Sequence, residues 1–363
     1  MKPALLGLGL GAALLIAAAS TAAEPGAIVD DLLTRTLGFS PADLRAFDAG
    51  SAAIKSLDTP AREELAHVGV VYVDASNERF LERFRDIERF ERGPGIPQIG
   101  RFGSPPRLED LESLTLPATD VAALPTCRPG DCAVKLSATA MRRFRSEVDW
   151  SSSEAARQAN EVVRTMILEL VLAYQTNGNA ALGRYDDGDE PLPVAEKFHA
   201  LLAAEDPLPA PVPALMAYLD TYPRGRPAGV EDFFYWSVVD FGLKQTIRVS
   251  HVTIYPLAAD SPSGVVYAIA IKQLYASHYF NTTLELRFLV ADDRRAGRSG
   301  TALISITRSR SDGMTGFKGL LPRPIISRRS RVAVGGYLEH MKRQVERSGP
   351  AAIGAQAMLP SVR

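Results

Sequence analysis

Hydrophobic and polar positions alternate most regularly between Phe233 and Arg310, and this stretch predicts a block of antiparallel strands. In residues 279–291, one face would carry Phe280, Leu284 and Phe288, whereas mostly polar residues fall between them. Successive side chains of a strand point to opposite faces, so this alternation indicates a half-buried strand.

The same period predicts three neighbouring strands at Gln245–Tyr255, Val265–Leu274 and Thr301–Arg308. Ile304 and Ile306 share the apolar face of the last of them. Because the connections are short and polar, we expect an antiparallel meander with one buried face.

A helical pattern follows the strands, from about Arg328 to Glu346. Its apolar positions are Val334, Leu338, Met341 and Val345. Gly335 and Gly336 interrupt it, each at a cost of about 1 kcal/mol relative to alanine. They either allow close approach to the sheet or mark the start of a shorter helix. We expect the helix to cover the face of Leu284 and Ile304, because both apolar surfaces need a partner.

Several long antiparallel strands closed by a C-terminal helix resemble the helix-grip fold of the START-like superfamily. In that family a curved sheet wraps the long C-terminal helix, and the space between them holds an apolar ligand. The resemblance rests on the order of elements in the C-terminal third, not on a motif. It implies an α+β fold with an antiparallel sheet, a C-terminal helix packed on it, and a helical insertion or subdomain.

The first 23 residues have the pattern of a signal peptide. Lys2 is basic, Leu5–Ala19 is apolar, and small residues precede a cleavage site expected near Glu24. An uncleaved membrane anchor is the alternative, since the uncharged run is near the lower length limit of a span. We expect a periplasmic or secreted protein.

Shifts in pattern divide the remaining chain. The expected parts are 24–150, an N-terminal α+β part with a disulfide loop; 151–228, a helical insertion; 229–348, the antiparallel sheet and C-terminal helix; and 349–363, a flexible tail. The helical part either forms a subdomain or packs directly on the sheet. Cys127 and Cys132 flank a Pro-Gly turn, and in an exported chain this spacing predicts a disulfide. A redox role is the alternative.

The charge of the chain limits the classes of binding partner that we expect. The formal net charge of −1 provides no reason to expect nucleic acid as a partner. Residues 308–347 nevertheless hold ten Lys or Arg against three Asp or Glu, a local net charge of about +7. This basic region is the basis for an alternative in which the protein docks on an anionic membrane.

No zinc-protease, nucleophile-elbow or phosphate-loop motif is present, so we expect no cofactor and no metal. Whether the protein is an enzyme stays open. His251 and His278 could approach each other across strands, with Asp240 or Asp312 beside them. They would then transfer protons or, alternatively, be hydrogen-bonded core residues. Arg308 continues the Ile304 face and would meet either a ligand headgroup or a carboxylate in a salt bridge.

These patterns define a predicted ligand-binding set. Its members are Phe280, Leu284, Phe288, Ile304, His251, His278 and Arg308. Our first hypothesis is an exported binding or carrier protein for an apolar ligand such as a lipid. The alternatives are a periplasmic enzyme that uses the same cavity, and an envelope-associated structural protein that docks on anionic membrane.

Overall fold

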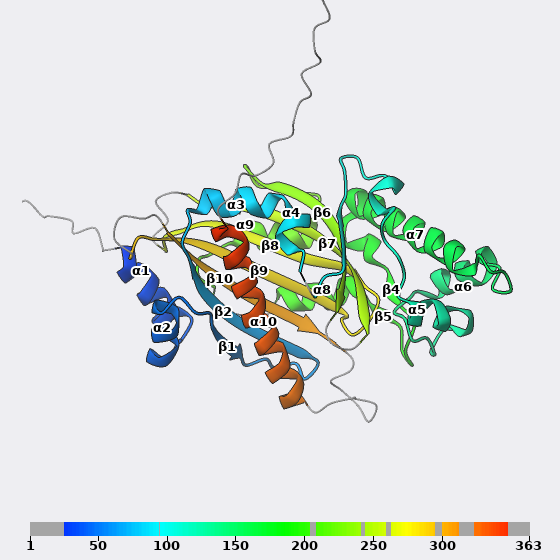
Figure 1. The fold of residues 1–363 in the computed structure, drawn as a ribbon, viewed down its shortest axis with the longest axis horizontal. Coiled ribbons are helices and arrows are strands. Elements are labelled where there is room, and N and C mark those ends of the chain that lie inside the picture. Colours follow the sequence, from blue (N-terminus) through cyan, green and yellow to red (C-terminus); the bar gives the residue numbers. More distant parts are fainter. Residues whose placement is uncertain are drawn as a thin grey trace, which may run out of the picture.

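The computed structural model describes residues 25–93, 95–203, 208–240, 244–258, 263–294, 300–311 and 323–347. The predicted signal peptide, the tail 349–363 and Asp312 lie outside these residues. The described chain forms a large antiparallel sheet with helices on both faces, including a C-terminal helix that crosses it (Figure 1). This is the α+β arrangement expected of a helix-grip-like fold.

The main sheet has eight strands in the order β1-β2-β10-β9-β8-β7-β6-β3. Their bounds are β1 Ala53–Leu57, β2 Glu64–Val73, β3 Gln98–Arg101, β6 Glu231–Asp240, β7 Gln245–Pro256, β8 Val265–Ala276, β9 Thr282–Asp292 and β10 Gly300–Arg310. The predicted strand block is thus confirmed. Strands from the N-terminal part complete the sheet on both edges. A two-stranded ribbon, β4 Arg184–Tyr185 and β5 Leu192–Pro193, lies apart.

One face of the sheet is covered by the C-terminal helix α10, Arg323–Glu346, together with α3, Asn77–Arg85, and α4, Ile87–Glu91. We call it the α10 face. Leu338, Met341 and Val345 of α10 are fully buried there. The helix lies close to the strands because glycine faces it: a Cβ on Gly69 would lie 2.5 Å from a Leu338 methyl carbon. Gly335 likewise abuts Ile54 of β1, so at Gly335 the close-approach interpretation is correct.

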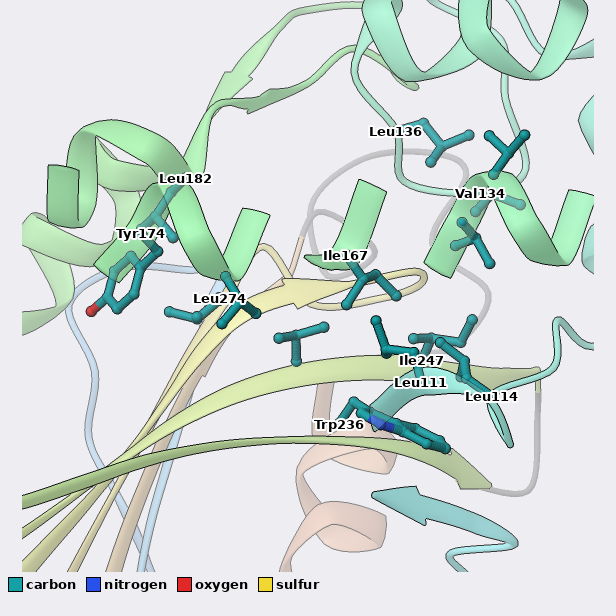
Figure 2. Packing of buried hydrophobic residues seen from close by; sticks show 14 of the residues in the cluster. Leu111, Leu114, Val134, Leu136, Ile167, Tyr174, Leu182, Trp236, Ile247 and Leu274 are labelled. Atoms are coloured by element: carbon teal, nitrogen blue, oxygen red, sulfur yellow. The ribbon is translucent and has the colours of Figure 1, made fainter. Parts of the chain in front are cut away.

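The opposite face has two helical covers. Near β2, β9 and β10 it packs against α1 Pro25–Asp31, η1 Leu32–Thr36, α2 Pro41–Asp48, α8 Val194–Leu202 and α9 Pro213–Thr221. Near β6 and β7 it packs against α5 Ala118–Ala123, α6 Ala138–Glu147 and α7 Ala155–Asn177, with the short 3₁₀ helices η2 Leu108–Leu111, η3 Leu124–Thr126 and η4 Gly178–Leu182. Figure 2 shows the second cover, in which Ile167 projects from α7 toward Ile247 on the strands.

Two expectations about burial are wrong. The sheet has two buried faces, not one. Leu284, Phe288 and Ile304 do share a face, but α10 covers the other one. The reason lies in β9 and β10. Leu289 and Leu303 are fully buried on the α10 face, and Phe288 is equally buried on the opposite face. A strand that is apolar on both faces does not indicate which face a given helix takes.

The predicted disulfide between Cys127 and Cys132 is confirmed. Its loop is docked through backbone hydrogen bonds from Gly130 to the Asp186 carbonyl and from Cys132 to the Asp187 carbonyl. Within the described ranges, no helix combines the length and the apolar character that crossing a membrane requires.

Candidate functional site: a buried polar cluster around Lys272

The structure brings three predicted ligand-binding residues into one row across the sheet. His251 of β7 pairs with Lys272 of β8, Lys272 pairs with Leu284 of β9, and Leu284 pairs with Arg308 of β10. All four are on the face opposite α10. Phe288 and Ile304 also pair with each other on this face, further along the strands. The row therefore contains three residues that the sequence patterns selected and one lysine, Lys272, that they did not select.

Lys272 is the most unusual member of the row. Its side chain is fully buried (0% exposed), and no carboxylate of the described chain forms an ion pair with it. The ammonium nitrogen Nζ instead donates hydrogen bonds to the Tyr174 hydroxyl, at 3.1 Å, and to the Asn179 side-chain oxygen. It also lies 3.8 Å from the centre of the Phe198 ring. Burial holds the pKa of Lys272 well below its usual range, which favours the uncharged amine.

A continuous hydrogen-bond chain leads from Lys272 to a carboxylate. The Tyr174 hydroxyl lies 3.3 Å from Nδ1 of His251, and Nε2 of His251 lies 2.9 Å from Asp232. Burial lowers the pKa of His251 despite the opposing effect of Asp232, so the ring is neutral near neutral pH. We call Lys272, Asn179, Tyr174, His251 and Asp232 the Lys272 cluster.

The direction of these hydrogen bonds follows from the chemistry of the groups. A carboxylate only accepts, so Nε2 of His251 carries the proton and donates it to Asp232. Nδ1 is then an acceptor for the Tyr174 hydroxyl. The Tyr174 oxygen in turn accepts from Lys272. The cluster can therefore pass a proton in steps between the buried amine and Asp232.

Asp232 connects the cluster to the surface. Burial alone would raise the pKa of this carboxyl, but hydrogen bonds from His251, Tyr218 and Thr253 outweigh burial and lower it. The two added bonds measure 2.8 Å from Tyr218 and 2.9 Å from Thr253. Arg226, whose side chain is 55% exposed, lies 3.4 Å from the same carboxylate. Asp232 is thus an ionised carboxylate at the surface end of the cluster, whereas Lys272 is at the fully buried end.

Glycine at the end of α7 makes the aromatic surroundings of the cluster possible. Gly178 has φ of +58°, which glycine adopts readily, and it ends α7 after Asn177, with its N–H donating to the Tyr174 carbonyl oxygen. A Cβ at this position would lie 1.7 Å from the Tyr222 carbonyl oxygen. Tyr222 can therefore stack on Tyr174, with ring centres 4.7 Å apart, and also cover His251 at 4.5 Å.

Arg308, at the other end of the row, forms a salt bridge and does not belong to the Lys272 cluster. It meets the buried Glu64 carboxylate, as the salt-bridge interpretation expected, and donates to the Leu201 carbonyl oxygen at 3.1 Å. Arg310 makes the same two kinds of contact, to Glu64 and to the Ala200 carbonyl. Cations suit the C-terminal end of a helix, which carries partial negative charge. The pair therefore fixes α8, whose Phe198 covers Lys272.

His278 and Phe280 lie outside this cluster. His278 is buried and bonds Asp120 of α5 through Nε2, at 2.9 and 3.0 Å. Phe280 is half-buried in the connection before β9, because that strand begins only at Thr282. The two predicted histidines thus take different carboxylates, and neither bonds Asp240 in the described structure. His278 attaches α5 to the end of the sheet.

The α10 face contains a second buried polar group, in the place where the START-like resemblance implies a ligand. Arg287 of β9 is fully buried between Glu285, at 2.7 Å, and Glu91, at 3.4 Å. Tyr337 of α10 bonds both Arg287 and Glu91. Burial raises the pKa of Glu91, whereas Arg287 lowers that of Glu285 in spite of burial. We call these four residues the Arg287 network.

Comparisons with known proteins add little to this picture. No protein-family model matches the chain, and no curated protein matches it. Among solved structures, the Zhui aromatase/cyclase from Streptomyces sp. R1128 is similar at 17% sequence identity, covering 45% of this chain and 90% of its own. The TM-score is 0.23, so the superposition establishes no shared activity. Within the described residues, no group of three His, Cys, Asp or Glu side chains could hold a metal ion.

Sequence patterns missed four residues of the cluster: Tyr174, Asn179, Asp232 and Lys272. Tyr174 lies 77 residues before its partner His251, and only the docking of α7 brings them together. For Lys272 a signal did exist. It follows Ala268 and Ala270 on one face of a strand whose other face is also apolar, so that face had to be buried as well.

Proposed function

We propose that the protein binds an apolar small molecule on the sheet face opposite α10, with the Lys272 cluster as its polar contact. The observation that carries this proposal is the fully buried Lys272 amine, which has no ion pair in the described structure. Burying an amine among aromatic rings is unfavourable, and packing alone does not require it. Strongly perturbed ionisable groups are concentrated at functional sites.

The surroundings of the amine support an apolar ligand. Small-molecule sites are mostly apolar, with a few convergent polar groups that fix orientation. This face of the sheet has that composition around Lys272: Leu284, Phe288 and Ile304 supply hydrocarbon surface, and Lys272 and His251 supply polar atoms. This ligand is the apolar cargo of the carrier hypothesis. The signal peptide that would export the carrier remains a prediction.

A matched pair of variants on β9 tests the proposal. Leu284→Ala removes apolar surface beside Lys272, and Leu289→Ala removes the same side chain from the α10 face. Both leucines are buried, so each change should lower the free energy of unfolding by about 2–5 kcal/mol. Only Leu284→Ala should also reduce binding of an apolar fluorescent fatty-acid probe, by about tenfold or more.

Native mass spectrometry of gently purified protein supplies the second readout. We expect a co-purifying apolar compound with the wild-type chain and with Leu289→Ala, and loss of that compound with Leu284→Ala. Equal probe binding by the two variants, at equal folded fraction, would contradict the proposed site.

A further inference from the structure

The chemistry of the Lys272 amine narrows the ligand class. We propose that Lys272 captures an apolar aldehyde or ketone as a covalent imine. This inference rests on the proposed function, since it assigns the chemical class of the ligand bound at that site.

The geometry supplies what imine formation needs. An amine adds to a carbonyl only in its uncharged form, and no carboxylate of the described chain lies within ion-pair distance of Lys272. Asp220 favours the charged form from a longer distance, but burial outweighs this effect. The burial of Lys272 among Phe198 and Tyr174 disfavours the charged form further. A lysine desolvated in apolar surroundings is the usual form of an amine nucleophile.

The reaction is balanced without any other reactant. The lone pair of Nζ forms a bond to the carbonyl carbon, the π electrons move to the oxygen, and one proton passes from the nitrogen to this oxygen to give a carbinolamine. The hydroxyl group then takes a second proton and leaves as water while the nitrogen lone pair forms the C=N bond, and the nitrogen loses its second proton to give the neutral imine. The product is the imine plus one water molecule, and no oxidant or reductant takes part.

The neighbours of Lys272 suit the proton movements. The Tyr174 hydroxyl lies 3.1 Å from Nζ, close enough to give a proton to the carbonyl-derived oxygen as it forms. The proton that Nζ gives up can then return to the Tyr174 oxygen, which already accepts a hydrogen bond from Nζ, while His251 and Asp232 hold the hydroxyl in place behind it. Tyr174 is thus assigned as the acid–base group and His251 as its positioning residue.

A second basic residue that is fully buried in the sheet, Arg287, shows why the assignment falls on Lys272. Arg287 is equally buried, but it is held between two carboxylates, and a guanidinium keeps its charge in proteins. It therefore cannot act as a nucleophile. Arg287 is thus a buried cation that carboxylates neutralise, whereas Lys272 is an amine whose burial disfavours its charged form.

Reductive trapping with a matched pair of probes tests the inference. Decanal and decanol have the same apolar chain, but only decanal can form an imine. The full-length protein is incubated with each compound and with sodium cyanoborohydride, which reduces an imine to a stable amine. Proteolysis and mass spectrometry then locate the added decyl group. We expect it on the peptide that contains Lys272, with decanal only.

Variants complete the design. Lys272→Met should lose the trapped adduct at this peptide, whereas Lys244→Met, at an exposed lysine, should retain it. Tyr174→Phe should slow trapping by on the order of tenfold while retaining decanol binding. Because the adduct is mapped in the wild-type protein, the result does not depend on the folding of any variant.

The outcomes separate the two proposals. Binding of decanal and decanol without an adduct on Lys272 overturns the imine and leaves the proposed function standing. Failure of both compounds to bind, together with failure of the fatty-acid probe, overturns the proposed function itself. An adduct on Lys272 that forms at the same rate in Tyr174→Phe removes the acid–base role of Tyr174.

Discussion

Arg287 and Lys272, two buried basic residues on opposite faces of the sheet, have opposite surroundings. On the α10 face, Arg287 is surrounded by Glu285, Glu91 and Tyr337. On the opposite face, Lys272 has a tyrosine, an amide and an aromatic ring but no carboxylate partner in the described chain. Both side chains are fully buried, so exposure does not explain the difference. The comparison teaches that the carboxylate partners of Arg287 account for its burial, whereas Lys272 has no such partner within ion-pair distance, and the proposed site is placed there for this reason.

The largest expected effect comes from breaking the neutralised network. Arg287→Met leaves Glu91 and Glu285 buried without their cation, so the free energy of unfolding should fall by about 3–5 kcal/mol. Lys272→Met removes an amine without leaving an unpaired charge, and it should change stability little or increase it. Urea denaturation of both variants checks this contrast, and equal losses of stability would contradict it.

A smaller effect concerns His67, which lies beneath the N-terminal half of α10. Burial, reinforced by the Arg331 charge, lowers its pKa to about 4. Between pH 6.5 and about 4 the unfolded chain therefore binds the proton more readily, and stability should fall as the pH falls through this window. The full loss from this residue would be roughly 3 kcal/mol.

His67→Gln isolates that contribution, because glutamine can hydrogen-bond Ser56 as His67 does but does not titrate. The variant should lose less stability on acidification than the wild type. Part of the slope should remain, since burial lowers the pKa of His251 in the same direction. Denaturation curves at several pH values measure both slopes, and identical slopes would show that His67 titrates normally in the fold.

The sequence predicted local structure well. Period-two alternation located β7 to β10 within a few residues, and helical spacing located α10. It also placed Leu284 and Ile304 correctly on the same face. Their facing depends only on the alternation of side chains along each strand and on the pairing of neighbouring strands. The Cys127–Cys132 disulfide followed from a short Pro-Gly spacing.

The local sequence pattern could not predict which face of the sheet each helix covers. Both faces of β9 and β10 are apolar, so nothing local assigned α10 to the side of Leu289 instead of Leu284. The cluster was hidden for a related reason. Tyr174 and Lys272 are 98 residues apart, and their contact depends on how α7 docks, which no spacing in the sequence encodes.

The central claim is that Lys272 is uncharged within the fold, and the pH dependence of stability tests it most directly. In the unfolded chain this amine regains its ordinary pKa of about 10.4, so below that pH the unfolded state binds the extra proton. Raising the pH from about 7 to 10 should therefore stabilise the wild-type protein relative to Lys272→Met, by up to about 1.4 kcal/mol per pH unit. Lys244→Met should follow the wild type. If the curves of wild type and Lys272→Met run parallel, the amine is charged in the fold, and the account of this site is wrong.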